Sequence, residues 1–398
     1  MRRRTRLLLC TTVLAALAGP APLAAAQGAD DDPTTLPGVP DVLAPGQGCT
    51  TVPGKDTAAA PWTRGALGLE QVWRLSRGRG VTVAVVGSGV SDGPAVLAGR
   101  VRVLGDAGRD CVGRGTFQAG LVAGAALPGQ GFSGVAPEAR ILAVRGTGER
   151  GEPDAARLAA GVREAAEAGA GVITVTAPLD GTDPRVMEAM AVARSKDALV
   201  IAPAAADGTP PGGADPQPAP VAPAQALAVL DTGPQGTRPE SAPPFRHADL
   251  SAPGGALVGP GPVGDGKWTG SGASMAAAIT AGTAALVRSY HPALNAEGVR
   301  EALLAGAYPG DLPALDPYGA VSGVAPGTAA APAEAAHVDP VSLPEAPRTA
   351  GARTTALLVT VVAAGTVLLV AFLAVVLPRG RSRGWRPGRL DDRGTSAR

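Results

Sequence analysis

Residues 81–90 read VTVAVVGSGV, and this stretch decides the fold. Its first six residues are a nearly continuous run of β-branched side chains, which is typical of a parallel strand buried on both faces. Similar runs predict further strands at residues 139–144, 171–176, 198–202 and 226–230. Helical spacing predicts helices at residues 65–76, 119–126, 154–168, 185–194, 274–290 and 296–305, the last capped by Asn295. Strands that alternate with helices of about 10–15 residues indicate an α/β fold with a mostly parallel sheet flanked by helices.

Residues 1–26 have the layout of a secretory signal peptide. Arginines at positions 2, 3, 4 and 6 precede a mostly apolar stretch from Leu7 to Leu17, and small residues follow at 24–26. A charged start, an apolar centre and a small-residue cleavage site are the features of such a leader. The alternative is a leader that stays uncleaved as a membrane anchor. Residues 27–61, rich in Asp, Pro, Gly and Ala, are expected to form an N-terminal extension.

A second apolar stretch, residues 355–377, contains 23 residues and no charge. As a helix it would be about 34 Å long, at about 1.5 Å per residue, which is enough to cross a hydrocarbon core of about 30 Å. The Ala/Pro-rich residues 323–354 are expected to form a tether to it. The positive-inside rule makes the basic residues 378–398 a cytoplasmic tail. The sequence therefore predicts a single-pass protein of the cell membrane whose large domain is extracytoplasmic.

The net charge limits the kinds of partner that the protein can bind, and the cysteine content indicates the redox state of its compartment. A net charge of +1 argues against nucleic acid as a partner. Because Cys10 lies in the leader, Cys49 and Cys111 remain as an even pair in an oxidising compartment. A disulfide between them would link the N-terminal extension to the domain body. Two free buried thiols are the alternative.

Three segments resemble motifs of the subtilases, in the order in which that family carries its catalytic Asp, His and Ser. They are residues 83–90 (VAVVGSGV), 110–120 (DCVGRGTFQAG) and 272–278 (GASMAAA), with further similarity at 132–139 (FSGVAPEA) and 251–254 (SAPG). The resemblance covers about residues 62–322 and implies a subtilisin-like, doubly wound sheet. The layout of leader, extension, subtilase domain, proline-rich tether, single span and basic tail resembles the mycosins, the subtilases associated with type VII secretion in actinobacteria. The resemblance implies no cofactor and no metal.

The resemblance also locates the catalytic positions, of which only one keeps its residue. Ser274 matches the nucleophile, but Gly87 stands at the position of the aspartate and Arg114 at that of the histidine. A serine needs a neighbouring base that a carboxylate orients, and a protonated guanidinium cannot accept a proton. The oxyanion asparagine of the family falls at about Ala206, within one residue, and residues 197–224 contain no asparagine.

The remaining side chains also have structural interpretations. Ser274 at the start of a helix could cap that helix, and Asp110, four residues before Arg114, could form a local ion pair with it. The glycines at 113, 115, 120 and 282 are expected to allow close packing of the backbone. The histidines all lie away from the expected site, at His247, His291 and His337.

The sequence therefore favours a pseudoprotease, a subtilase scaffold with a structural or peptide-binding role in type VII secretion. Its expected partners are the membrane, secretion components or an extended peptide, because pairing with an edge strand needs no catalytic triad. The alternative is an active serine endopeptidase in which a non-standard base acts on Ser274. Lys267 is the lysine closest to that serine in the sequence.

Overall fold

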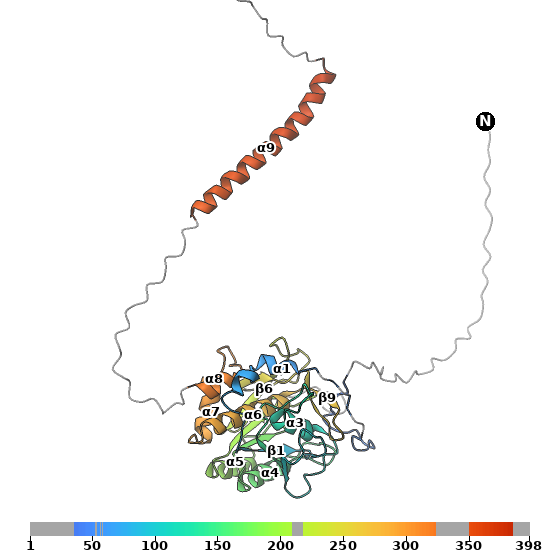
Figure 1. Cartoon of the computed structure of the whole chain (residues 1–398), viewed down its shortest axis with the longest axis vertical. Coiled ribbons are helices and arrows are strands. Elements are labelled where there is room, and N and C mark those ends of the chain that lie inside the picture. The colour runs from blue at the N-terminus through green and yellow to red at the C-terminus, as the bar shows by residue number, and fades with distance from the viewer. Residues whose placement is uncertain are drawn as a thin grey trace, which may run out of the picture. The chain divides into compact units, whose positions relative to one another are not determined.

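The computed structural model of the chain describes residues 36–51, 54–55, 57, 59–208, 218–323 and 350–384. The chain divides into two compact units, residues 1–329 and residues 330–398. The first unit contains an α/β domain and the second contains one long helix (Figure 1).

The first unit is built on a seven-stranded sheet in which every strand runs parallel to its neighbours. The strands are β1 (Thr82–Gly87), β2 (Val101–Val103), β3 (Arg140–Arg145), β4 (Val172–Val175), β5 (Leu199–Pro203), β6 (Ala226–Thr232) and β7 (Leu250–Pro253). Their order is β2-β3-β1-β4-β5-β6-β7, so the chain extends the sheet on both sides of β1. This order confirms the predicted doubly wound sheet. A separate antiparallel pair consists of β8 (Leu257–Pro260) and β9 (Lys267–Gly270).

Helices cover both faces of this sheet (Figure 1). On one face lie α3 (Arg114–Ala123) and α6 (Ala273–Tyr290), and on the other lie α4 (Ala155–Glu167) and α5 (Pro184–Ser195). The shorter helices pack on the side of α6, and they are α1 (Trp62–Ala66), α2 (Leu69–Val72), α7 (Ala296–Ala305) and α8 (Pro317–Ser322). The domain therefore has the layers that the alternating pattern predicts.

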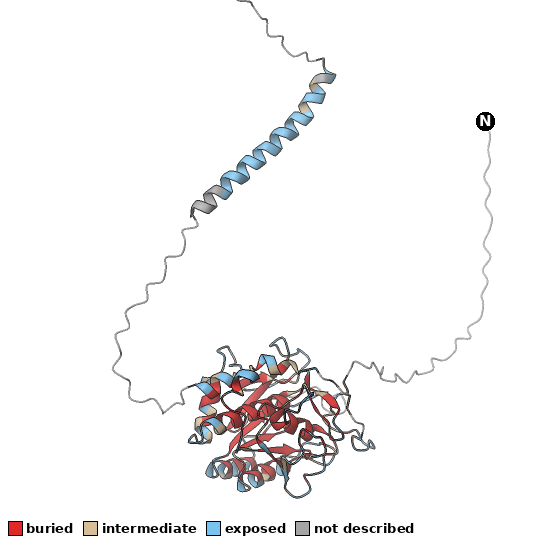
Figure 2. Cartoon of the chain, viewed as in Figure 1, coloured by how far each residue is buried: buried red, intermediate tan, exposed pale blue. Residues whose placement is uncertain are grey.

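The strand β1 lies between two apolar layers. Val83 and Val85 contribute to the layer formed with α3 and α6, whereas Ala84 and Val86 contribute to the layer formed with α4 and α5. All four side chains are completely buried, and buried residues form the centre of the domain in Figure 2. This confirms that the β-branched run is a strand buried on both faces. The end of β1 and the start of α3 are thereby held on a close-packed core.

Several element boundaries differ from the predicted ones. The helix expected at residues 65–76 is two short helices, α1 and α2, and α3 begins at Arg114 instead of residue 119. The sequence pattern does not predict the short strands β2, β7, β8 and β9, which have three or four residues each. Asn295 caps α7 as predicted, because its side chain accepts a hydrogen bond from Gly298 N at 2.9 Å.

The glycines predicted to allow close packing do so. A Cβ atom at Gly115 would lie 2.0 Å from the carbonyl oxygen of Gly89, and one at Gly120 would lie 2.3 Å from Pro260. Positions 113 and 282 are similarly crowded, at 2.8 Å and 2.7 Å from neighbouring side chains. Larger residues at these positions would push α3 and α6 away from their neighbours.

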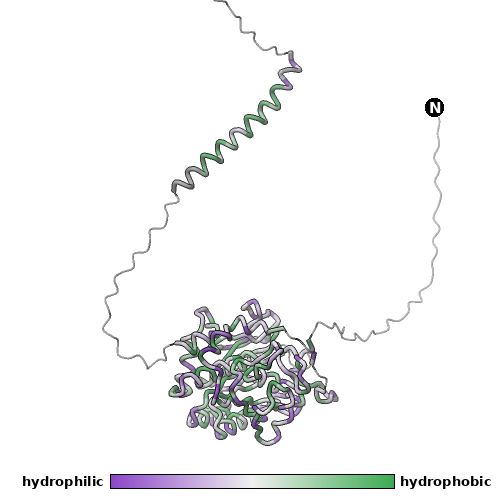
Figure 3. The backbone as a smooth tube through the Cα atoms, viewed as in Figure 1, coloured by the Kyte–Doolittle hydropathy of each residue, from purple (hydrophilic) through white to green (hydrophobic). Residues whose placement is uncertain are grey.

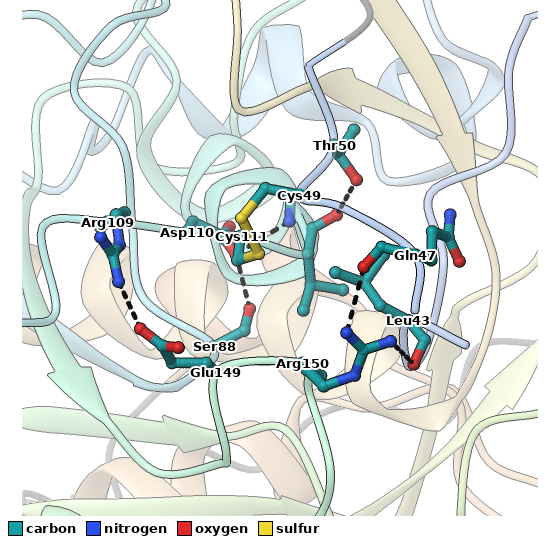
Figure 4. The surroundings of a disulfide bond; sticks show 12 residues. Leu43, Gln47, Cys49, Thr50, Ser88, Arg109, Asp110, Cys111, Glu149 and Arg150 are labelled. Atoms are coloured by element: carbon teal, nitrogen blue, oxygen red, sulfur yellow. Dashed lines mark hydrogen bonds and ion pairs between the residues drawn. A yellow bond between two sulfur atoms is a disulfide. The ribbon is translucent and has the colours of Figure 1, made fainter. Parts of the chain in front are cut away.

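The described part of the N-terminal extension, residues 36–51, is packed along the domain. Val39 N donates a hydrogen bond to Thr269 O at 2.8 Å, which joins the extension to β9. Further along, Leu43 N donates to Arg150 O at 2.8 Å, and Leu43 O accepts from the Arg150 guanidinium at 2.9 Å (Figure 4). Because Val39 and Leu43 are buried, the extension contributes to the folded core.

A covalent bond also holds the extension. Cys49 and Cys111 form the predicted disulfide, and beside it Thr50 N donates to Cys111 O at 2.8 Å (Figure 4). Cys111 lies three residues before Arg114, the first residue of α3. The disulfide therefore connects the extension to the start of α3, where Arg114 stands at the expected histidine position.

The second unit contains α9 (Ala350–Ser382). Residues Ala356–Gly380 of this helix are long and apolar enough to cross a membrane, with a mean hydropathy of 2.7, and the helix is largely hydrophobic in Figure 3. This candidate span overlaps the predicted residues 355–377. The predicted leader, nearly all of the predicted tether and the end of the predicted tail lie outside the described residues.

We expect the disulfide to contribute measurably to stability, because it closes a loop between cysteines 62 positions apart. The double change Cys49→Ser and Cys111→Ser should lower the free energy of unfolding by about 2–4 kcal/mol. Thermal unfolding with and without reductant measures this. Reductant should lower the Tm of the parent protein and leave that of the variant unchanged. Two free thiols in the mature protein, denatured without reductant, would contradict the bond.

Candidate functional site

Three positions singled out in the sequence meet where β1 ends and where α3 and α6 begin. Gly87 is the last residue of β1, Arg114 the first of α3, and Ser274 the second of α6. Arg114 Nη2 lies 3.2 Å from Ser274 Oγ. Ser88, directly after Gly87, accepts a hydrogen bond at 3.0 Å from the N–H of Gly115, directly after Arg114. Segments far apart in the sequence therefore form one cluster.

The Ser274 hydroxyl is completely buried and is surrounded by hydrogen-bond donors. Its oxygen accepts from Gln118 Nε2 at 2.7 Å and from Arg114 Nη2 at 3.2 Å. Neither an amide nitrogen nor a guanidinium can take the hydroxyl proton. Gln118 was not among the candidates from the sequence, although its spacing of four from Arg114 places both on one face of α3.

The expectation that Ser274 caps α6 is wrong. The cap residue is Gly272, which has no side chain to make a cap hydrogen bond, and α6 begins at Ala273. Ser274 lies inside the first turn, where its hydroxyl faces α3 and its N–H donates to Asp207 Oδ1 at 3.0 Å. The helix starts one residue earlier than predicted, so Ser274 is its second residue and not its cap.

Arg114 is held between two carboxylates, an arrangement that we call the Arg114 clamp. Its Nη1 donates to Asp41 Oδ1 and its Nη2 donates to Asp207 Oδ2. The Arg114 and Asp207 side chains are only 6% and 5% exposed, whereas that of Asp41 is 39% exposed. Asp41 belongs to the N-terminal extension, and Asp207 lies in the loop after β5. The clamp therefore joins three distant parts of the chain.

The clamp keeps Arg114 charged. Burial lowers the pKa of Arg114, but the charges of Asp207 and Asp41 outweigh this effect and hold the pKa above its ordinary value. Burial raises the pKa of the Asp41 carboxyl, while the Arg114 charge opposes this shift and the Asp207 charge adds to it. Arg114 consequently stays protonated and cannot act as a base toward Ser274.

The expected ion pair between Asp110 and Arg114 is wrong. Asp110 instead accepts hydrogen bonds from Gly113 N, from Thr116 N and Oγ1, and from Ser88 Oγ, at 2.7–2.9 Å. Figure 4 shows Asp110 directed toward Ser88 beside the disulfide. Burial raises the pKa of this carboxyl in spite of these hydrogen bonds. Asp110 therefore fastens the start of α3 to the end of β1, away from the guanidinium.

The position of Gly87 has no room for a side chain. A Cβ atom there would lie 2.3 Å from Thr176 Cγ2 and 3.1 Å from Thr176 Oγ1. Thr176 Oγ1 is buried and has no hydrogen-bond partner among the described residues. The threonine methyl group thus occupies the space that an aspartate side chain at position 87 would enter.

Lys267, the alternative base, is engaged at a different place. Its Nζ donates to Asp265 O at 2.6 Å, in the turn between β8 and β9, and to Gln130 Oε1 at 3.2 Å, in the loop after α3. The hydrogen bonds of the Ser274 hydroxyl go to α3 instead. Within the described part of the chain, no hydrogen bond joins the lysine to the serine.

The histidines lie apart from the cluster as well. His247 Nε2 lies 3.2 Å from Asp249, His291 Nε2 lies 2.8 Å from Val321 O, and His337 falls outside the described residues. Among the residues that the structure describes, no group of three or more His, Cys, Asp or Glu side chains could hold a metal ion.

Two cavities flank the Arg114 clamp. The larger has a volume of about 520 Å³ and extends past Thr176 along a mostly apolar wall. The smaller has a volume of about 400 Å³ and lies between the N-terminal extension and residues 238–243. Asp41, Ala206 and Asp207 line both cavities. Ala206, the residue expected near the oxyanion asparagine, contributes only a methyl group here.

Comparison with known proteins identifies the family. Residues 78–331 match the Subtilase family. The chain is 31% identical to Mycosin-3 of Mycobacterium tuberculosis, in a match that covers 74% of this chain and 79% of that protein. It is 38% identical to Mycosin-1 of the same organism, but that match covers 37% of this chain and only 35% of Mycosin-1. The chain belongs to the subtilase family, and within it to the mycosins.

Solved structures share the fold. The MycP3 protease from the type VII (ESX-3) secretion system is 30% identical, with a TM-score of 0.56 over 73% of this chain and 98% of that chain. A chain of an intact ESX-5 inner membrane complex is 25% identical, with a TM-score of 0.59 over 83% of this chain and 96% of that chain. These similarities confirm the subtilisin-like fold that the motifs imply.

We expect the Arg114 clamp to be worth far more to stability than a surface ion pair. Arg114→Met leaves the buried Asp207 carboxylate without its main partner, which should cost about 3–5 kcal/mol of unfolding free energy. The matched control is Arg109→Met, because Arg109 pairs with Glu149 through side chains that are 75% and 62% exposed. That control should cost about 0–1 kcal/mol.

Denaturant unfolding of a double variant completes this test. Adding Asp207→Asn to Arg114→Met removes the unpaired charge and should recover a large part of the lost stability. Equal losses from Arg114→Met and Arg109→Met, or no recovery in the double variant, would show that the clamp does not stabilise the fold.

Proposed function

We propose that this mycosin is a pseudoprotease, a membrane-anchored subtilase domain that serves as an extracytoplasmic structural part of a type VII secretion complex. The observation that carries the proposal is the Arg114 clamp beside Ser274. A serine nucleophile needs a neighbouring base to take its proton. Here the neighbours of the serine oxygen are a charged guanidinium and an amide, so the hydroxyl stays unactivated.

We assign the oxyanion position to Asp207, one residue after the expected Ala206. In serine proteases the N–H of the nucleophile is one of the donors that face the oxyanion. The N–H of Ser274 is instead occupied by Asp207 Oδ1 at 3.0 Å. A carboxylate at this place would repel the negative charge that develops in the transition state, so it opposes the reaction that an amide would assist.

The size of the expected fall in kcat determines whether the protein would be a slow enzyme or an inactive one. In subtilisin, a member of the same family, loss of one oxyanion donor lowers kcat about 10²–10³-fold, and loss of the triad lowers it about 10⁶-fold. This chain combines Gly87 and Arg114 at two triad positions with a carboxylate at the oxyanion position. Hydrolysis by Ser274 should therefore be undetectable.

The proposed secretion role is supported by the relatives and by the membrane helix. A chain of an ESX-5 inner membrane complex shares the fold over most of this chain. The candidate span Ala356–Gly380 would anchor the domain at the membrane, and arginines at 379, 381 and 383 favour a cytoplasmic side for the tail. With a cleaved leader, residues 27 to about 354 would then lie outside the cytoplasm.

The topology is testable by protease treatment of intact cells. We expect added protease to release the large domain by cutting in the Ala/Pro-rich residues 323–354 and to leave the tail protected. Antibodies against the domain and against a tag after Arg398 distinguish the two ends. A domain that resists digestion until the membrane is broken would show that the topology is inverted.

Absence of activity is testable with a fluorophosphonate probe, which labels only activated serines. We expect no labelling of Ser274 and no cleavage of casein-type substrates, because the hydroxyl is hydrogen-bonded to a guanidinium and an amide nitrogen and to no group that serves as its base. Labelling that disappears in Ser274→Ala would refute the proposal. Lys267→Met would then show whether that lysine supplies the base.

The reverse experiment rebuilds the catalytic groups. Three changes restore the orienting carboxylate, the base and the oxyanion donor, and they are Gly87→Asp, Arg114→His and Asp207→Asn. A fourth change, Thr176→Ser, removes the methyl group that lies 2.3 Å from the new Cβ atom. We expect measurable probe labelling only when Thr176→Ser is included. The triple variant without that change is the matched control. Equal labelling of both variants would show that Thr176 does not block the aspartate position.

A further inference from the structure

The seven-stranded sheet has one covered edge and one open edge. Its two outermost strands are β7 and β2. The outer side of β7 is covered, because Ser251 N donates to Pro313 O and Ser251 O accepts from Leu315 N, both at 2.8 Å. The outer side of β2 makes no backbone hydrogen bond to any of the described residues. Only one of the two edges is therefore open to another strand within the part of the chain that the structure describes.

The polar groups that β2 leaves unpaired follow from its register with β3. β2 bonds to β3 through Arg100 O and Leu104 N, both at 3.0 Å. In a parallel pair, residues that bond to the neighbouring strand alternate with residues whose N–H and C=O point away from it. Arg102 therefore faces β3, and the N–H and C=O groups of Val101 and Val103 face outward. Such a row of unpaired groups is a template for another extended chain.

Three arginines lie along one face of this edge. Arg100 directly precedes β2, Arg102 is its central residue, and Arg140 is the first residue of β3. Arg102 Nη2 donates at 2.7 Å to Ala168 O, at the end of α4. Because side chains two positions apart in a strand share a face, Arg100 lies on the α4 face with Arg102, and Arg140 lies there with Leu142. None of the three forms an ion pair within the described part of the chain.

The charge of this edge determines which kind of strand can pair with it. If the β2 edges of two copies paired antiparallel about a two-fold axis, the two Arg102 residues would lie directly opposite each other, with Cα atoms about 4.5 Å apart. Like charges in that position destabilise a pair of strands. A strand with carboxylates on the matching face would instead gain ionic contacts together with the backbone hydrogen bonds. The arginines thus oppose pairing with a second copy and favour an acidic strand.

We propose that the open edge of β2 binds an extended acidic segment of a partner protein, which adds a strand to the sheet. The backbone of this segment pairs with the outward N–H and C=O groups of Val101 and Val103, and its carboxylates lie beside the three arginines. None of these edge residues is among the described residues that line the two cavities beside the Arg114 clamp. The inference rests on the proposed structural role and gives the chemistry of a partner, but it does not depend on the reactivity of Ser274.

Fluorescence anisotropy with the full chain in detergent tests the role of charge. The probe is acetyl-Gly-Glu-Val-Glu-Val-Glu-Gly with a dye at the C-terminus, and its three glutamates share one face of a strand. The matched control, acetyl-Gly-Glu-Glu-Val-Val-Glu-Gly, has the same composition but divides the glutamates between the two faces. We expect the probe to bind about 3- to 30-fold more tightly than the control, and high salt to weaken this binding. Equal affinity of the two peptides would overturn the inference.

The role of backbone pairing is tested with two N-methylated versions of the probe. Successive N–H groups of a strand point to opposite edges, so methylation of the first two glutamates blocks one edge and methylation of the two valines blocks the other. We expect one of these peptides to bind about 10- to 100-fold more weakly, as for two lost hydrogen bonds, and the other to bind like the probe. Equal affinities of the two methylated peptides would show that no strand pairing occurs.

Variants place the binding at β2. Val103→Pro removes an outward N–H without disturbing β3, because proline is tolerated where the N–H of an edge strand faces solvent. It should weaken binding of the probe about 3- to 10-fold, and Arg140→Gln should weaken it about 2- to 5-fold. The matched control is Arg194→Gln, an exposed arginine at the end of α5, which should have no effect. An unchanged Tm shows that each variant is folded, and full affinity of the folded variants would contradict the proposal.

Two further measurements separate this inference from its alternatives. Sedimentation of the full chain in detergent should show no dimer that depends on this edge. A dimer that Val103→Pro abolishes would mean that the edge pairs with a second copy, which overturns the choice of an acidic partner. Fluorophosphonate labelling of Ser274 together with normal binding of the probe contradicts only the pseudoprotease proposal. Absence of labelling together with absence of binding contradicts only this inference.

Discussion

The buried charge of Arg114 is the constraint on which the rest of the site depends. Removing an ion from water costs several kcal/mol unless close partners replace its hydration. Arg114 is 6% exposed in its side chain, and Asp41 and Asp207 supply these partners. One partner comes from the N-terminal extension and the other from the loop after β5. One buried side chain thus ties together the start of α3, the N-terminal extension and the loop after β5.

The other side chains around Arg114 are consistent with this one constraint. With no imidazole to orient, a carboxylate at position 87 would have no function, and Thr176 fills its space. Asp207 accepts from the N–H of Ser274 with one carboxylate oxygen and from the Arg114 guanidinium with the other. The extension, anchored by the disulfide at Cys49, brings Asp41 to the same point. The domain keeps the subtilisin-like fold and holds a fixed ion cluster beside Ser274.

The sequence predicts the parts of this structure that rest on periodic patterns or on paired cysteines. The sheet, its flanking helices, the Asn295 cap and the disulfide all follow from such signals. The clamp could not be predicted, because Asp41 lies 73 positions from Arg114 in a segment without periodicity. The expected pair between Asp110 and Arg114 failed for a related reason. A spacing of four brings side chains together only within a helix, and Asp110 precedes α3.

The state of the Arg114 guanidinium can be measured most directly by NMR of nitrogen-labelled arginine side chains. Rotation about the Cζ–Nη bonds averages the signals of a solvated guanidinium, whereas hydrogen bonds from both Nη groups to fixed carboxylates suppress that rotation. We expect one set of separate, slowly exchanging Nη signals that disappears in Arg114→Met and shifts in Asp207→Asn. If no resolved guanidinium signal depends on Arg114, the side chain is not held between the two carboxylates, and this account of the site is wrong.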